Sequence, residues 1–174
     1  MGANAVSYHY FRIEHSTFKS PNTSVPVVLP DLSKRATWAV FGQVNDFHRW
    51  DGWSPWAKMD PAMKTTYSGA AAGEGASYAW VGNSQVGEGR MTITESRPSD
   101  HIVVRLEFVK PMAATNTATF TFKPDAGGTD VTWAMDGNNG FMGKAFSVFM
   151  NMDKMLGAYF EQGLGQMKVA AEHS

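Results

Sequence analysis

The residues best suited to proton transfer lie in the segment 45–56, where His48 is flanked by Asp46 and Asp51. A histidine beside a carboxylate is the minimum for general acid–base chemistry, because imidazole titrates near neutral pH and a carboxylate can orient the ring. The carboxylates stand two and three residues from the histidine on a turn-rich segment, and no nucleophile is near in the sequence. This spacing is also typical of a solvated capping network, which is the interpretation we favour.

The other chemical motifs are weak. Residues 82–87 (GNSQVG) approach the Gly-x-Ser-x-Gly elbow but hold one residue too many and lack a strand-to-helix context. His9 and His15 are six positions apart on one predicted strand, roughly 20 Å at about 3.3 Å per residue, which is too far to chelate one ion. The glycine pairs do not match nucleotide-binding patterns, and the chain has no cysteine. We therefore predict no metal, no cofactor and no thiol chemistry.

Composition favours one aromatic-rich globular domain over residues 1–174. Of 174 residues, 43% are hydrophobic, 13% aromatic and 18% charged, and the length is sufficient for a substantial core. The formal charge is −1 and no basic cluster stands out, so we predict no nucleic-acid binding. No apolar run approaches the ~18 residues of a membrane span, and residues 1–10 lack the character of a secretory signal. We expect no membrane insertion, a cytoplasmic location, and a monomer or homodimer.

Hydrophobic alternation predicts a mainly antiparallel β protein. Strand patterns are separated by Gly-, Pro- or Asp-rich breaks, and consecutive short strands of this kind favour an antiparallel sheet. The predicted strands are 8–18, 63–69, 75–82, 86–96, 101–110, 114–123 and 129–137. Three prolines within 19–30 predict an irregular insertion after the first strand.

The same alternation assigns one apolar face to the sheet. Its members are Ile102, Val104, Leu106, Phe108, Ala118, Phe120, Phe122, Val131, Trp133 and Met135. Asn116 falls on this face too, and an unpaired amide in apolar surroundings is costly. Its partner is either a bound ligand or water, or backbone at the strand end.

Helical spacing predicts helices over about 32–43 and 45–50 and a long one over 140–172. The last helix presents Ala145, Phe149, Met152, Leu156, Phe160 and Leu164 every three or four residues. Its methionines are able to line an adaptable pocket or fill an ordinary core. Gly157, Gly163 and Gly165 each cost about 0.8–1 kcal/mol relative to Ala inside a helix, which close packing or a bend would offset.

Three of the six tryptophans, Trp50, Trp53 and Trp56, fall within seven residues beside Gly52 and Pro55. Because each buries roughly 150–250 Å² when it packs, the segment predicts a rigid aromatic corner, and the alternative is a gate to a ligand site.

This corner and several later motifs resemble the START-like superfamily, in particular its bacterial polyketide cyclase/dehydrase-type (SRPBCC) branch. The later motifs are Met59-Asp-Pro61, Gly87-Glu-Gly-Arg-Met-Thr-Ile93 and Val131-Thr-Trp-Ala-Met135, followed by the terminal helix. The resemblance covers residues 8–18 and 36–172, and the insertion at 19–30 departs from it. It implies an α+β helix-grip fold, in which a curved antiparallel sheet wraps around the C-terminal helix and encloses an apolar cavity.

Three functions follow as hypotheses. The first is binding of a small hydrophobic molecule, lipid or polyketide-like, between the sheet and the C-terminal helix. The residues expected to bind it are Trp56, Trp80, Val104, Leu106, Asn116, Phe120, Trp133, Met135, Phe149, Met152 and Leu156. The second is a cyclase- or dehydrase-type enzyme that takes acid–base groups from His48, Asp51, Asn116 or Asp136. The third is an interaction module like the domain that activates chaperone ATPases.

Overall fold

The computed structural model describes residues 11–19, 32–125, 128–137 and 152–172. The predicted insertion, apart from its first residue, and residues 140–151 of the predicted helix 140–172 lie outside the described residues. So does Phe149, while Met152, Leu156 and Asp136 are described in their backbone alone.

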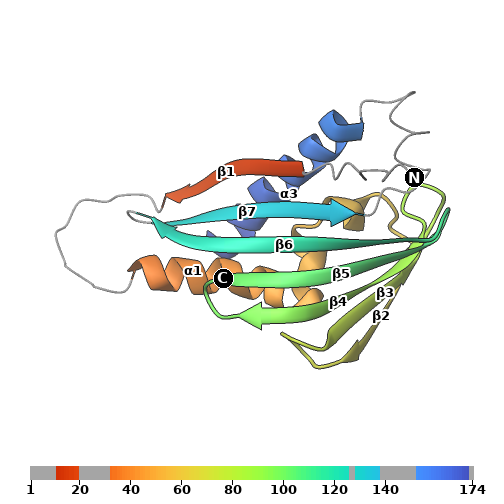
Figure 1. Ribbon diagram of the computed structural model, residues 1–174, viewed down its shortest axis with the longest axis horizontal. Helices are drawn as coiled ribbons and strands as arrows, with labels where there is room; N and C mark the ends of the chain where they lie inside the picture. The colour runs from red at the N-terminus through yellow and green to blue at the C-terminus, as the bar shows by residue number, and fades with distance from the viewer. Residues whose placement is uncertain (1–10, 20–31, 126–127, 138–151, 173–174) are drawn as a thin grey trace, which may run out of the picture.

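Seven strands form one antiparallel sheet in the order β1-β7-β6-β5-β4-β3-β2, a meander whose first strand pairs with its last (Figure 1). The strands are β1 (Phe11–Lys19), β2 (Lys64–Gly69), β3 (Ala76–Val81), β4 (Glu88–Arg97), β5 (His101–Lys110), β6 (Ala114–Asp125) and β7 (Gly128–Gly137). Each predicted strand is present within one to three residues of its predicted ends, because the hydrophobic alternation of a half-buried strand is a strong local signal.

Within the described residues, two α-helices lie on the same side of the sheet (Figure 1). They are α1 (Leu32–Asn45) and α3 (Met152–Glu172), and two short 3-10 helices, η1 (Phe47–Gly52) and η2 (Pro55–Lys58), follow α1. The α1 helix packs on β6 and β7, whereas α3 packs on α1 and β1. The architecture is therefore the predicted α+β helix-grip fold.

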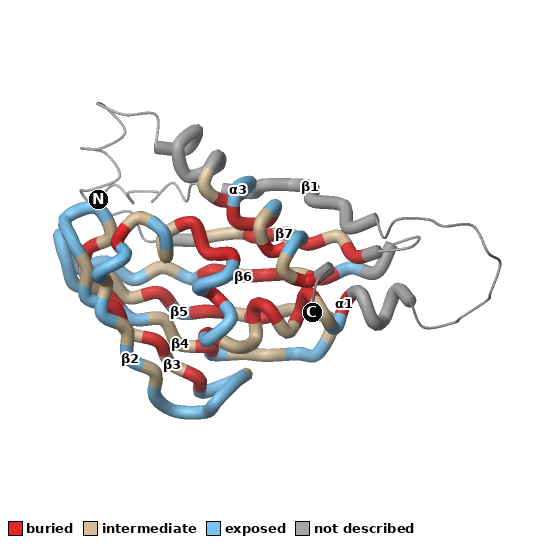
Figure 2. Tube along the Cα trace, turned by 180° about the vertical axis from the view of Figure 1, so that it is seen from behind, coloured by how far each residue is buried: buried red, intermediate tan, exposed pale blue. Residues whose placement is uncertain are grey.

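The core lies between this face of the sheet and the helices, where Figure 2 shows the buried segments. Phe41 of α1 packs on Phe122 with ring centroids 5.4 Å apart, and Phe160 of α3 stacks on Trp133 at 4.2 Å. The predicted apolar face is confirmed: Ile102, Val104, Leu106, Phe120, Phe122, Val131 and Trp133 are all buried.

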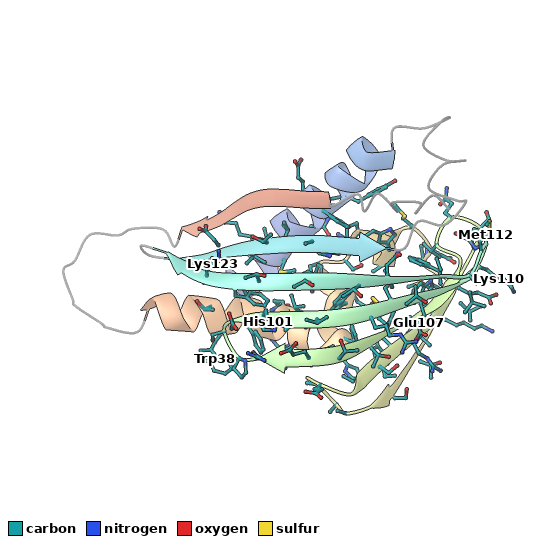
Figure 3. All side chains as sticks on the ribbon, viewed as in Figure 1. Trp38, His101, Glu107, Lys110, Met112 and Lys123 are labelled. Carbon is teal, nitrogen blue, oxygen red and sulfur yellow. The ribbon has the colours of Figure 1, made fainter. Side chains whose placement is uncertain are left out.

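The opposite face of the sheet carries charged side chains. Arg105 pairs with Glu107 and Lys110 with Glu88, both at 2.6 Å. Figure 3 shows Glu107 and Lys110 toward one end of β5, with His101 at the other. Such exposed pairs contribute about 0–1 kcal/mol each, so the apolar face stabilises the fold.

The glycines of α3 serve close packing in at least one case. A Cβ added at Gly163 would lie 3.1 Å from Cζ3 of Trp133 and 3.2 Å from Pro55, whereas one at Gly165 would meet nothing within 4 Å. Gly163 therefore lets the helix approach the aromatic corner, and Gly165 has no such role.

Candidate functional site

A cavity of about 290 Å³ lies over one half of the apolar sheet face, close to the lower end of the range typical of small-molecule sites. Its floor is formed by side chains from β3 to β7. Its roof is the segment 50–63, and residues 85 and 86 complete one side. The cavity is lined mainly by aromatic and aliphatic groups.

Strand register explains the floor. Tyr78 of β3 is paired with Met91 of β4, Met91 with Leu106 of β5, and Leu106 with Asn116 of β6. Because directly paired residues point to the same face of a sheet, these four side chains form one row, and all four line the cavity. The neighbouring residues of the floor are Trp80, Phe108, Ala118 and Met135.

The other half of the apolar face is filled by helices. Phe120 contacts the rings of Trp50 and Trp53 at 6.0 and 6.2 Å, and Val104 on the neighbouring strand β5 is fully buried. Neither Val104 nor Phe120 is among the lining residues. These two positions, predicted as ligand contacts, belong to the packed core, although their paired residues Ala118 and Trp133 line the cavity.

The aromatic corner forms the roof because it is tied to the end of α1. Trp50 Nε1 donates to the carbonyl of Val44, and Trp53 Nε1 to that of Gln43, each at 3.0 Å. The last four carbonyls of a helix lack partners within the helix, so the two indoles satisfy them and orient the corner. Trp53 is fully buried, while Trp50 and Trp56 face the cavity. The corner is thus both a packed unit and a wall.

One wall is held by Trp80. Its Nε1 donates to the carbonyl of Val86 at 3.0 Å, and its ring lies against Gly89 on the neighbouring strand. Any residue larger than glycine at position 89 would clash with the indole, because a Cβ there would overlap the ring. Gly89 is therefore a packing requirement of the cavity wall.

Asp60 holds together two segments at the edge of the cavity, which we call its rim. This buried carboxylate accepts the N–H of Ala62 at 3.0 Å and that of Asn83 at 2.7 Å. It thereby joins the turn before β2 to the β3–β4 hairpin, two segments that contribute Met63 and Val86 to the lining. Charge-assisted hydrogen bonds of this kind are stronger than neutral ones.

Several polar side chains face the apolar cavity. The floor contributes Tyr78 and Asn116, and the roof contributes Asp51 and Ser54. Burial, reinforced by the negative charges of Asp51 and of the Tyr67 phenolate, raises the pKa of Tyr78 well above its ordinary value. The Tyr78 hydroxyl therefore stays protonated and is available as a donor.

Trp133 occupies the centre of the aromatic cluster. Its ring stacks on Phe120 at 4.8 Å and on Phe160 at 4.2 Å, and it lines the cavity. Its buried Nε1 has no hydrogen-bond partner among the described residues. An unpaired buried donor costs about 1–3 kcal/mol, so an acceptor that reached this N–H would be favoured.

His48 is placed away from the cavity. Its Nδ1 lies 2.8 Å from Asp46 Oδ1, which also accepts the His48 N–H at 2.9 Å, and its ring stacks on Tyr67 at 4.0 Å. More than half of its side chain is exposed (56%), and it is not a lining residue. The histidine therefore belongs to the N-cap of η1, the capping network favoured from the sequence, while Asp51 alone of the three faces the cavity.

Of the predicted contact residues, six line the cavity: Trp56, Trp80, Leu106, Asn116, Trp133 and Met135. Phe149 and the side chains of Met152 and Leu156 are outside the described part of the chain. None of the described side chains of α3 is in the lining, which comes from the sheet and the segment 50–63 instead.

Lining residues that were not predicted from the sequence include Tyr78, Met91 and Phe108. Phe108 was assigned to the apolar face, and Tyr78 alternates with Trp80 on one strand, so the sequence pattern indicated an inward-facing side chain at both positions. The pattern gave no such indication for Met91, because its position opposite Tyr78 depends on strand register.

The described residues contain no group of three or more His, Cys, Asp or Glu side chains arranged to hold a metal ion. Neither described helix combines the length and apolar character needed to cross a bilayer.

Comparison with solved structures gives the same fold. A Chromobacterium violaceum protein has 14% identity and a TM-score of 0.58, over 94% of this chain and 97% of that one. A Rhizobium leguminosarum protein has 12% identity and a TM-score of 0.59, over 97% of both chains. A protein of the dynemicin biosynthetic locus has 16% identity and a TM-score of 0.56, over 94% of this chain but 47% of its own length.

Sequence comparison identifies the family. None of the curated proteins compared with the chain matches it. Residues 29–172, however, match the family described as "Polyketide cyclase / dehydrase and lipid transport". This span includes the roof, the floor and α3, and the helix-grip fold agrees with the resemblance seen in the sequence motifs. The chain belongs to the polyketide cyclase/dehydrase and lipid transport family.

Proposed function

We propose that this protein binds a small hydrophobic molecule in the cavity between the sheet and the segment 50–63. The observation that carries the proposal is the mainly apolar lining, to which Trp50, Trp56, Trp80, Phe108 and Trp133 contribute aromatic rings. Concave apolar sites with a few polar groups are the usual form of small-molecule sites. The family is consistent with this, since its description includes lipid transport.

The cavity is also well supported structurally. The roof is fixed by two indole hydrogen bonds to α1, and the rim by Asp60. A preformed site loses little conformational entropy when a ligand enters, which favours binding.

Nile red, a neutral hydrophobic dye, tests the proposal. Ala118 is buried and lines the cavity, so Ala118→Leu should place extra volume inside it and weaken dye binding at least about tenfold. Ala134 alternates with Trp133 and Met135 and faces the other side of β7, so Ala134→Leu is the matched control and should leave the affinity unchanged. Fluorescence titration measures both.

The proposal fails if the folded wild-type protein does not bind the dye, or if the two leucine variants bind it equally. Thermal unfolding of each variant shows whether a loss of binding reflects a loss of fold.

A second candidate is cyclase- or dehydrase-type chemistry, favoured by the carboxylate of Asp51 and the hydroxyl of Tyr78 at the same cavity. The two groups have the types needed for a base and an acid. In a screen of poly-β-ketone substrates, turnover abolished by Asp51→Asn with unchanged dye affinity would support it. A cavity that binds such substrates without converting them would leave binding as the function.

A further inference from the structure

The row of side chains across the cavity floor is polar at both ends and apolar in the middle. Tyr78 stands at the β3 end and Asn116 at the β6 end, with Met91 and Leu106 between them. The two polar residues are three strands apart, and at about 4.8 Å per strand their backbones are separated by roughly 14 Å. An elongated ligand lying along this row would reach both.

The polar groups at both ends lack good protein partners. Tyr78 is more than nine-tenths buried, and no described group hydrogen-bonds its hydroxyl. Asn116 Nδ2 contacts only the sulfur of Met135, at 3.9 Å, and thioether sulfur is a weak acceptor. The Asn116 side chain is half-buried, and both residues line the cavity. Because neither polar group has a strong protein partner, each is open to a hydrogen bond from a ligand that enters the cavity.

The two ends differ in chemistry. Asp51 also lines the cavity, and its negative charge acts on Tyr78. A ligand hydroxyl at this end would accept from the Tyr78 hydroxyl and donate to the Asp51 carboxylate, whereas a carboxylate would be repelled. The Asn116 amide both donates and accepts, so it suits a hydroxyl or a carbonyl.

We infer that the ligand is an elongated, neutral molecule with an apolar middle and an oxygen function at each end, a hydroxyl at Tyr78 and a hydroxyl or carbonyl at Asn116. This inference rests on the proposed function and specifies its ligand class. Simple hydrocarbons and fatty acids are thereby poorer ligands than a chain with a hydroxyl at both ends.

The test compares decanol with the decanediol that has a hydroxyl at each end. The affinity of each alcohol is measured by its displacement of Nile red. The dissociation constant of Nile red itself is measured first for each variant. Tyr78→Phe and Asn116→Leu each remove one anchor with little change in volume. Either substitution should weaken the diol about 3- to 10-fold, the usual effect of one neutral hydrogen bond.

Decanol provides the internal control. With one hydroxyl it is able to use either end, so each single variant should bind it within about twofold of wild type, and the double variant should lose about 3- to 10-fold. Asp51→Asn keeps the side-chain size and removes the charge, so it should improve binding of decanoate relative to wild type. Asn116→Ala replaces Asn116→Leu if the latter does not fold.

The outcomes separate the two proposals. If neither alcohol nor Nile red binds the folded wild type, the proposed function itself is wrong. If all three bind, but the diol is unaffected by both single variants or is weakened no more than decanol, the two-ended ligand is wrong and the cavity binds by apolar contact alone.

Discussion

Gly89→Ala should deform the cavity wall although it adds a single methyl group. A Cβ at this position would overlap Cη2 of Trp80 and would lie 2.5 Å from its Cζ2 and 2.6 Å from the backbone oxygen of Glu107. Real Cβ contacts do not occur below 3.0 Å, and the carbonyl belongs to the paired strand β5. The indole must therefore rotate away or the β4–β5 ladder must open.

The expected loss follows from two contributions. Overpacking a filled site costs about 1–3 kcal/mol. Rotation of Trp80 also breaks the hydrogen bond from its Nε1 to the carbonyl of Val86, which contributes about 0.5–1.5 kcal/mol. Together they predict a decrease of about 1.5–4.5 kcal/mol in the free energy of unfolding.

Urea denaturation followed by tryptophan fluorescence measures this loss, and Nile red titration measures the change in the cavity. Gly165→Ala is the matched control, because a Cβ there meets nothing within 4 Å. Since alanine is the better helix former, that variant should gain about 0.5–1 kcal/mol. A Gly89→Ala protein that loses less than about 0.5 kcal/mol, with unchanged dye affinity, would refute the packing argument.

Three further predictions concern polar groups. Asp60→Asn should weaken the acceptor for the N–H of Asn83 and cost about 1.5–3 kcal/mol in urea denaturation; a neutral effect would show that the rim does not depend on this contact. A phenol whose pKa is higher in the folded protein than in the unfolded chain stabilises the fold fully below about pH 10, and this stability is lost as pH rises. The alkaline decrease in unfolding free energy should accordingly be shallower in Tyr78→Phe than in wild type, and parallel curves would contradict the assignment. His48→Ala should leave Nile red affinity unchanged, because its ring is outside the cavity; a loss above about threefold would place it in the site.

The strands were predictable because their signals are local, whereas the helix-grip arrangement followed from the family resemblance. Alternation with period two identified six of the strands closely, and it also identified the buried face that includes Phe120 and Trp133. The cluster of three tryptophans indicated a packed corner, and the structure shows how: two of their indoles satisfy the end of α1. The capping role of His48 was likewise visible in its spacing from Asp46.

The choice of which apolar residues line the cavity was not predictable in the same way. Val104 and Leu106 alternate identically on β5, yet Val104 is packed in the core and Leu106 faces the cavity. The strand pattern does not explain this difference, because Ala118, the residue paired with Val104, lines the cavity. Where a helix rests depends on packing between elements distant in the chain.

By itself, then, the amino-acid sequence determined the type and order of the elements, the face of each strand that is buried, and the absence of cysteine chemistry. Those properties depend on neighbours a few residues apart. The tertiary structure alone decided that Tyr78, Met91, Leu106 and Asn116 form one row, and that Gly89 makes room for Trp80. Each of these depends on strand register and on contacts between distant segments, which local periodicity does not encode.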